Sequence, residues 1–191
     1  MFVKALLTAA GLCLAATSAN AVTYGGTFSG LNESTPNAST ATGYGTLRIV
    51  GNSIEVSIAY SGLGSGLQAG HIHCCSLPGV NSGVAVGFGG LSTGSTSGTI
   101  VRTIDLTVAS SFNNGFRAAN GGTADGARAA FFTGLSNGQA YYNLHTTNIG
   151  SGEIRANLAL VPEPASWAMM VVGFGLVGGA IRRRSTALAT A

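Results

Sequence analysis

Residues 45–63 read GTLRIVGNSIEVSIAYSGL, and this stretch predicts the fold class of the chain. From Ile54 to Tyr60, apolar side chains alternate with small or polar ones. Such alternation is typical of a strand with one face on a core and the other toward water. Gly51-Asn52 interrupts the pattern and supplies a two-residue turn. The stretch therefore predicts an antiparallel hairpin.

Two more segments repeat this alternation. Residues 100–108 place apolar side chains on the even positions, apart from Arg102. In residues 153–160 the predicted inward set is Ile154, Ala156, Leu158 and Leu160, and the outward set is Glu153, Arg155 and Asn157. Glu153 and Arg155 would form an ion pair on the surface or at the strand end, worth about 0–1 kcal/mol. Short alternating runs between Gly, Asn and Ser breaks predict an all-β antiparallel sandwich, immunoglobulin-like or related.

One short helix is expected in this domain. Residues 123–135 carry Ala127, Ala130 and Phe131 at helical spacing, and Gly134 is a candidate for the helix end. We expect the preceding residues 113–122 to form an exposed loop.

The first 21 residues have the three parts of a secretory signal peptide. Lys4 is followed by an apolar run over residues 5–16 and by a small-residue exit that contains Ala19 and Ala21. The apolar run is shorter than the roughly 20 residues that cross a bilayer. We predict a signal helix that signal peptidase removes after Ala21, which leaves a domain over residues 22–160.

The C-terminal region combines three elements in order. They are Pro162-Glu163-Pro164, an uncharged apolar stretch, and the cluster Arg182, Arg183 and Arg184. At roughly 1.5 Å per residue, residues 165–181 span about 26 Å as a helix, which predicts a transmembrane helix. The positive-inside rule keeps the arginines and a tail over residues 185–191 cytoplasmic, so the domain lies outside.

The order of elements in residues 161–184 resembles the PEP-CTERM sorting signal of Gram-negative bacteria. The resemblance implies processing by an exosortase, a transient stay in the inner membrane, and delivery to the cell surface or an exopolysaccharide matrix. A permanent single-span anchor would give the same topology, so cleavage or retention of the tail stays open.

The charge of the domain excludes nucleic acid as an expected partner. Residues 22–160 contain five arginines and five acidic residues, so the net charge of +3 of the whole chain comes from the two ends. The ten residues are Arg48, Arg102, Arg117, Arg128, Arg155, Glu33, Glu55, Asp105, Asp125 and Glu153.

The three histidines of the chain are candidates for chemistry. His71 and His73 are two positions apart, so an extended backbone directs both to one face, while His145 comes from a distant strand. This set would hold Zn or Cu. Alternatively, the rings hydrogen-bond loop backbone and hold two strands in register. The lack of a carboxylate nearby in the sequence favours this second interpretation.

Cys74 and Cys75 are adjacent, and export implies an oxidising compartment. Three states remain open for them: a strained bond to each other, intermolecular bridges, or thiolate ligation beside the histidines.

Several motifs along residues 24–160 resemble the CHRD domain, a module named after chordin and found in secreted proteins. The motifs lie at residues 28–33, 43–45, 70–73, 135–138, 141–146 and 152–155. The resemblance implies an all-β immunoglobulin-like or related sandwich. The module has no established catalytic residues, so none is carried over.

Three hypotheses for function follow. The first is a non-enzymatic surface or matrix domain that acts by binding. The second is a secreted metal-binding β-sandwich that holds Zn or Cu, with redox activity as an option. The third is adhesion to exopolysaccharide, in which the rings of Tyr44, Tyr60, Tyr141 and Tyr142 stack on sugars, although Tyr60 and Tyr142 share parity with core residues.

Overall fold

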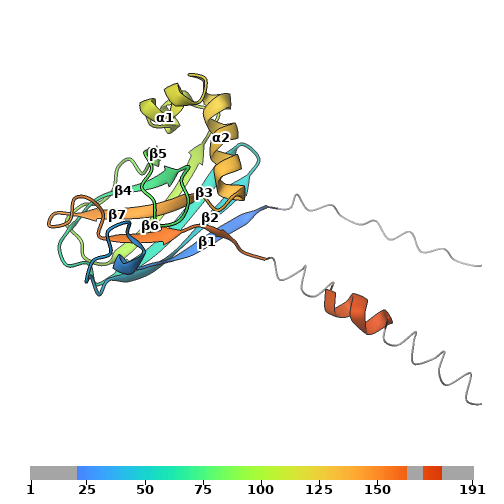
Figure 1. Cartoon of the computed structure of the whole chain (residues 1–191), viewed down its shortest axis with the longest axis horizontal. Coiled ribbons are helices and arrows are strands. Elements are labelled where there is room, and N and C mark those ends of the chain that lie inside the picture. Colours follow the sequence, from blue (N-terminus) through green and yellow to red (C-terminus); the bar gives the residue numbers. More distant parts are fainter. Residues whose placement is uncertain (1–20, 163–169, 178–191) are drawn as a thin grey trace, which may run out of the picture.

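The computed structural model describes residues 21–162 and 170–177, and the first of these ranges is a β-sandwich with two helices at one end (Figure 1). The strands are β1 Thr23–Phe28, β2 Thr42–Val50, β3 Ser53–Ser61, β4 Leu67–Cys74, β5 Val84–Gly87, β6 Gly98–Asp105, β7 Ala140–Thr146, β8 Ile154–Asn157 and β9 Ala159–Leu160. The helices are η1 Gly30–Asn32, η2 Ala109–Ser111, α1 Asn114–Ala119 and α2 Ala124–Ser136.

The strands form two antiparallel sheets, which confirms the predicted fold class. The five-stranded sheet has the order β6-β3-β2-β1-β9, and the four-stranded sheet has the order β5-β4-β7-β8. The predicted hairpin is β2–β3, in which Val50 faces Ser53 across the Gly51-Asn52 turn. Gly51 has a φ of 59°, a left-handed conformation that favours glycine.

The core lies between the sheets and consists of the inward side chains of both. Leu47 and Ile58 from the larger sheet and Ile72 and Leu144 from the smaller one are at most 1% exposed. The hydroxyl of Tyr142 donates to the Thr46 carbonyl oxygen at 2.8 Å, which joins the two layers. Burial of apolar surface at about 25 cal/mol per Å² is the main force that holds the layers together.

The helical region differs in part from the prediction. α2 begins one residue later than expected and continues past Gly134 to Ser136, with the Thr123 side chain accepting from the Gly126 amide as N-cap. Residues 113–122 are not all loop, because they contain α1. The Asn113 side chain accepts from the Gly115 amide at 2.9 Å and starts this helix.

The predicted strand over residues 100–108 ends early. Asp105 ends β6 because its carboxylate accepts from the Thr107 amide at 2.8 Å and from the Thr107 hydroxyl at 2.7 Å, which turns the chain. Leu106 is still buried, but Val108 is 46% exposed and precedes η2.

The last predicted strand is divided between the two sheets. β8 pairs with β7 and β9 pairs with β1, so the chain crosses from one layer to the other at Leu158. Leu160 was expected inward and is 62% exposed after this crossing. Glu153 and Arg155 were expected at the surface and are 1% and 0% exposed. Arg155 points to the predicted outer face, where it packs on Tyr141, but a loop that contains Val80 covers it.

The two ends of the domain leave it together, because Tyr24 of β1 faces Leu160 of β9 (Figure 1). The predicted signal helix and most of the predicted transmembrane helix lie outside the described residues. Residues 170–177 form an exposed helix. Within the described parts of the chain, no helix is both long and apolar enough to cross a bilayer.

Candidate metal centre

The three histidines lie together on the outer face of the four-stranded sheet. Ile72 points into the core, so His71 and His73 on either side of it point outward from β4. On the neighbouring strand β7, His145 faces Ala69, and this register brings it beside His71. The sheet therefore brings together all three residues that the sequence singled out.

The distances between the rings suit one shared ion. One ring nitrogen from each histidine lies within 4.8 Å of the others. Nδ1 of His71 is 3.1 Å from Nε2 of His145. A tetrahedral zinc with Zn–N bonds of about 2.0–2.1 Å holds its ligand nitrogens about 3.3–3.4 Å apart. The pair His71–His145 is already near that spacing, whereas a pair 4.8 Å apart would have to close by about 1.4 Å.

Backbone carbonyls fix the tautomers of two of the rings. Nδ1 of His73 donates to the Ser82 oxygen at 2.8 Å, and Nδ1 of His145 donates to the Gly150 oxygen at 3.0 Å. The Nε2 atom of each ring then carries a lone pair. Nε2 of His73 is buried without a hydrogen-bond partner. A carbonyl that orients an imidazole in this way is the usual outer partner of a metal ligand.

The surroundings keep all three rings neutral, which is the state that binds metal. Burial, followed by the neighbouring His145 and His73, lowers the pKa of His71 from 6.5 to about 4. Burial also lowers the pKa of His73, although its hydrogen bond to Ser82 acts in the opposite direction. The pKa of His145 is lowered by burial as well. Protons therefore compete weakly for these nitrogens near neutral pH.

A buried ion pair supports the histidines from the side of β8. Arg155 Nε donates to Glu33 Oε2 at 3.3 Å, and the guanidinium also contacts Asn81. Its Cζ lies 3.9 Å from the ring centroid of Tyr141. The Tyr141 ring in turn stacks on His73, with centroids 4.8 Å apart and planes 3° apart. Arg155 thus fixes the ring that positions His73.

The two buried acidic residues have separate structural partners, so the predicted pair of Glu153 with Arg155 does not form. Burial raises the pKa of Glu33, while Arg155 opposes the rise. Burial acts to raise the pKa of Glu153, but three hydrogen bonds together lower it. These come from the Gly64 amide at 2.8 Å and from the Ser39 and Thr146 hydroxyls at 2.7 Å.

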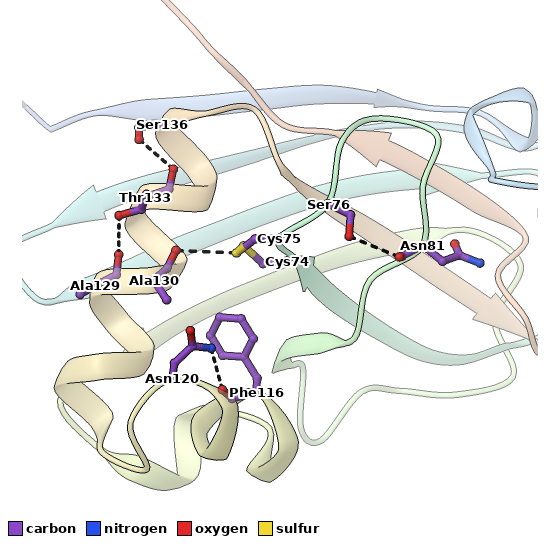
Figure 2. Close-up of a disulfide and its surroundings, with 10 residues drawn as sticks. All are labelled: Cys74, Cys75, Ser76, Asn81, Phe116, Asn120, Ala129, Ala130, Thr133 and Ser136. Carbon is purple, nitrogen blue, oxygen red and sulfur yellow. Dashed lines mark hydrogen bonds between the residues drawn. A yellow bond between two sulfur atoms is a disulfide. The ribbon is translucent and has the colours of Figure 1, made fainter.

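The cysteines lie away from the histidines. Cys74 and Cys75 form a disulfide with each other, beside α2 (Figure 2). Cys74 is 4% exposed and belongs to the core, which is the opposite face of β4 from His73. Cys75 Sγ is 3.7 Å from the Ala130 oxygen. Of the three states left open by the sequence, the structure has the bond within the pair, and neither sulfur joins the histidine cluster.

Sequence reasoning missed Glu33, Asn81, Tyr141 and Arg155 as parts of this site. Glu33 and Arg155 are 122 positions apart, and no local pattern joins them. Of the tyrosines considered for sugar stacking, Tyr44 is 49% exposed, whereas Tyr60, Tyr141 and Tyr142 are buried.

The predicted processing residues lie at or beyond the ends of the domain. Ala21 and Pro162 are the first and last residues of the longer described range. Outside the described residues are Ala19, Glu163, Pro164, Arg182, Arg183 and Arg184.

Comparison with known proteins gives two family matches. The CHRD domain matches residues 9–158. The PEP-CTERM protein-sorting motif matches residues 160–184. No curated protein and no solved structure matches the chain significantly.

Proposed function

The chain belongs to the CHRD domain family, and on that premise we propose that its domain is a non-enzymatic binding module that holds a transition-metal ion outside the cell. The ligands are His71, His73 and His145, and the ion is zinc or copper. The histidine cluster and the sorting motif support the two halves of this proposal separately.

The PEP-CTERM motif makes this an exported protein that an exosortase processes, with the cell surface or extracellular space as its destination. The finer itinerary is part of the proposal: removal of residues 1–21 by signal peptidase, a transient stay in the inner membrane, and release into an exopolysaccharide matrix. Because β1 pairs with β9, both processed ends would leave the sandwich at the same edge.

The observation that carries the metal assignment is the convergence of three neutral imidazoles. Nε2 of His73 is buried without a partner, and such an atom costs about 1–3 kcal/mol unless something satisfies it. An ion bound at the cluster removes that cost. Imidazole nitrogens suit zinc and copper, whereas magnesium and calcium prefer oxygen.

The surrounding acidic groups support a non-enzymatic role. A carboxyl group can act as a general acid or base only where it is free to exchange protons with a substrate. Glu33 is held by Arg155, and Glu153 is held by three donors. Both buried carboxylates therefore serve the structure.

Metal titration of the exported protein tests this function. After removal of metal with a chelator, the tag-free protein is titrated calorimetrically with Zn²⁺ and Cu²⁺, and its metal content is measured by elemental analysis. We expect one ion per chain. The double variant His71→Ala, His73→Ala should bind at least 100-fold more weakly, because two of three ligands are lost.

The matched control for this titration is Glu55→Gln, which removes a surface carboxylate on the other sheet and should leave binding unchanged. Circular dichroism of each variant reports whether it has folded. A folded wild-type protein that binds neither metal stoichiometrically would overturn the proposed function.

A further inference from the structure

A cavity opens at the β5 and β6 edge of the sandwich, away from the Arg155 ion pair. Its volume is about 470 Å³, and it lies between the edge strands β5 and β6 and the turn η2. Phe88, Phe112 and Ile104 give it apolar walls, while Arg102 and Asn113 contribute polar groups. This volume is within the roughly 300–1,000 Å³ of small-molecule sites.

Arg102 is fixed in place at this cavity by the backbone. Its Nε donates to the Gly89 oxygen at 3.2 Å, and its Nη2 donates to the Gly90 oxygen at 2.9 Å. Its Nη1 donates to the Val101 oxygen at 2.8 Å. These three bonds use three of the five guanidinium donors, so two N–H groups remain for a ligand.

Among the residues that the structure describes, no acidic side chain forms an ion pair with Arg102. Within residues 21–162, the ion pairs join Arg48 to Glu55, Arg128 to Asp125 and Arg155 to Glu33. A half-buried cation held in place beside apolar walls attracts an anion more strongly than a mobile one in open water, because the walls exclude part of the solvent. The guanidinium fork matches a carboxylate in shape.

The walls specify the rest of the ligand. Phe88 and Phe112 are 5% and 4% exposed, so their rings are held by the core and present fixed apolar surface. The Asn113 side chain is already used as the N-cap of α1. A ligand that fits these walls has a small apolar body and a single negative group.

We propose that this cavity binds a small carboxylate with a flat apolar body, with the carboxylate on Arg102 and the body against Phe88 and Phe112. The site lies beside the histidine cluster and binds its ligand without metal. His71 is the one residue that the two sites share, since it also lines the cavity.

Titration with benzoate, followed by ¹H–¹⁵N NMR of the metal-free exported protein, tests the proposal. Benzamide is the control ligand, because it has the same shape without the charge. We expect saturable shifts at Gly87, Gly89, Gly90 and the Arg102 Nε–H group with benzoate. Benzamide should bind at least tenfold more weakly.

Two variants and one control test whether Arg102 supplies the charge that binds benzoate. Arg102→Gln should weaken benzoate binding at least tenfold. Arg48→Gln, on the outer face of the same sheet, should leave the affinity for benzoate unchanged. Asn113→Asp keeps the N-cap and adds a negative charge to the cavity wall. It should therefore also weaken the binding of benzoate while preserving the fold.

The proposal is wrong if benzoate produces no saturable shifts in the wild-type protein, or if benzamide binds equally well. It is also wrong if neither charge-changing variant weakens binding. Because Asn113→Asp keeps all the Arg102 bonds, it remains decisive even if Arg102→Gln fails to fold.

Discussion

The outer faces of the two sheets have the same alternating sequence pattern and opposite environments. On the five-stranded sheet, Tyr44 and Val101 are 49% and 66% exposed. On the four-stranded sheet, Tyr141, Asn143 and Arg155 are at most 2% exposed, because residues 29–41 and 75–83 fold over them. Alternation therefore gives the direction of a side chain, and covering loops decide whether that side chain is exposed to water.

The ion pairs of the two faces should differ most in stability. Arg155→Met leaves Glu33 buried without its partner, which costs about 3–5 kcal/mol. Arg48→Met breaks the half-exposed pair with Glu55 and should cost less than about 1 kcal/mol. Urea unfolding of both variants measures the contrast. Equal losses in the free energy of unfolding would contradict the difference in burial between the two ion pairs.

Lowering the pH should destabilise the domain, because folding lowers the pKa values of the histidines on the four-stranded sheet. The pKa of His71 is about 4 in the folded domain and 6.5 without the fold, so the unfolded chain binds more protons between these values. Stability is therefore present above about pH 6.5 and is lost as the pH falls toward 4. For this residue the loss is at most about 3 kcal/mol, and partial exposure reduces it.

Thermal melts between pH 7 and pH 4 measure this loss. The melting temperature of the metal-free wild type should fall more steeply than that of the double variant His71→Ala, His73→Ala, because the variant lacks two of the histidines. The carboxyl groups are common to both proteins, so their contribution cancels in the comparison. Parallel curves would show that the histidine pKa values are not lowered by folding.

A methyl group added at Gly134 of α2 should be destabilising, because α2 packs against the disulfide at the end of β4. Glycine to alanine in a helix usually stabilises by about 0.5–1 kcal/mol. Here the new Cβ would collide with Cys74 Sγ and Cys75 Sγ, so Gly134→Ala should destabilise by about 1–3 kcal/mol. Ser136→Ala on the exposed side of α2 is the matched control in urea unfolding. A gain in stability for Gly134→Ala would contradict this packing.

The smallest expected effect is a coupling between the metal and the cavity. In the metal-free cluster, His71 Nδ1 donates to His145 Nε2, whose own Nδ1–H is used by Gly150. If a metal ion binds His71 Nδ1, the ring proton moves to Nε2, which is next to the Cδ2 atom that faces Gly87 in the cavity wall. This N–H group would be a further donor near the cavity. Zn²⁺ should therefore increase the affinity for benzoate severalfold.

Calorimetry of benzoate with and without Zn²⁺ measures this coupling, and linkage requires benzoate to tighten Zn²⁺ by the same factor. An unchanged or weaker affinity would contradict the assigned tautomers.

Local patterns predicted the parts of the fold that depend on neighbours in sequence. The β2–β3 hairpin and the shared direction of His71 and His73 follow from alternation alone. The burial of Arg155 does not, because its partner Glu33 comes from a loop near the other end of the domain. α1 was missed since its start depends on one capping side chain, Asn113, within a segment rich in turn residues.

The zinc X-ray absorption spectrum of the exported protein, loaded with one equivalent of Zn²⁺, reports directly on the atoms that bind the metal. We expect three imidazole nitrogens at about 2.0–2.1 Å and no sulfur ligand. The double variant should lose this signature. A spectrum with sulfur at about 2.3 Å, or one of hydrated zinc alone, would contradict the assignment of His71, His73 and His145.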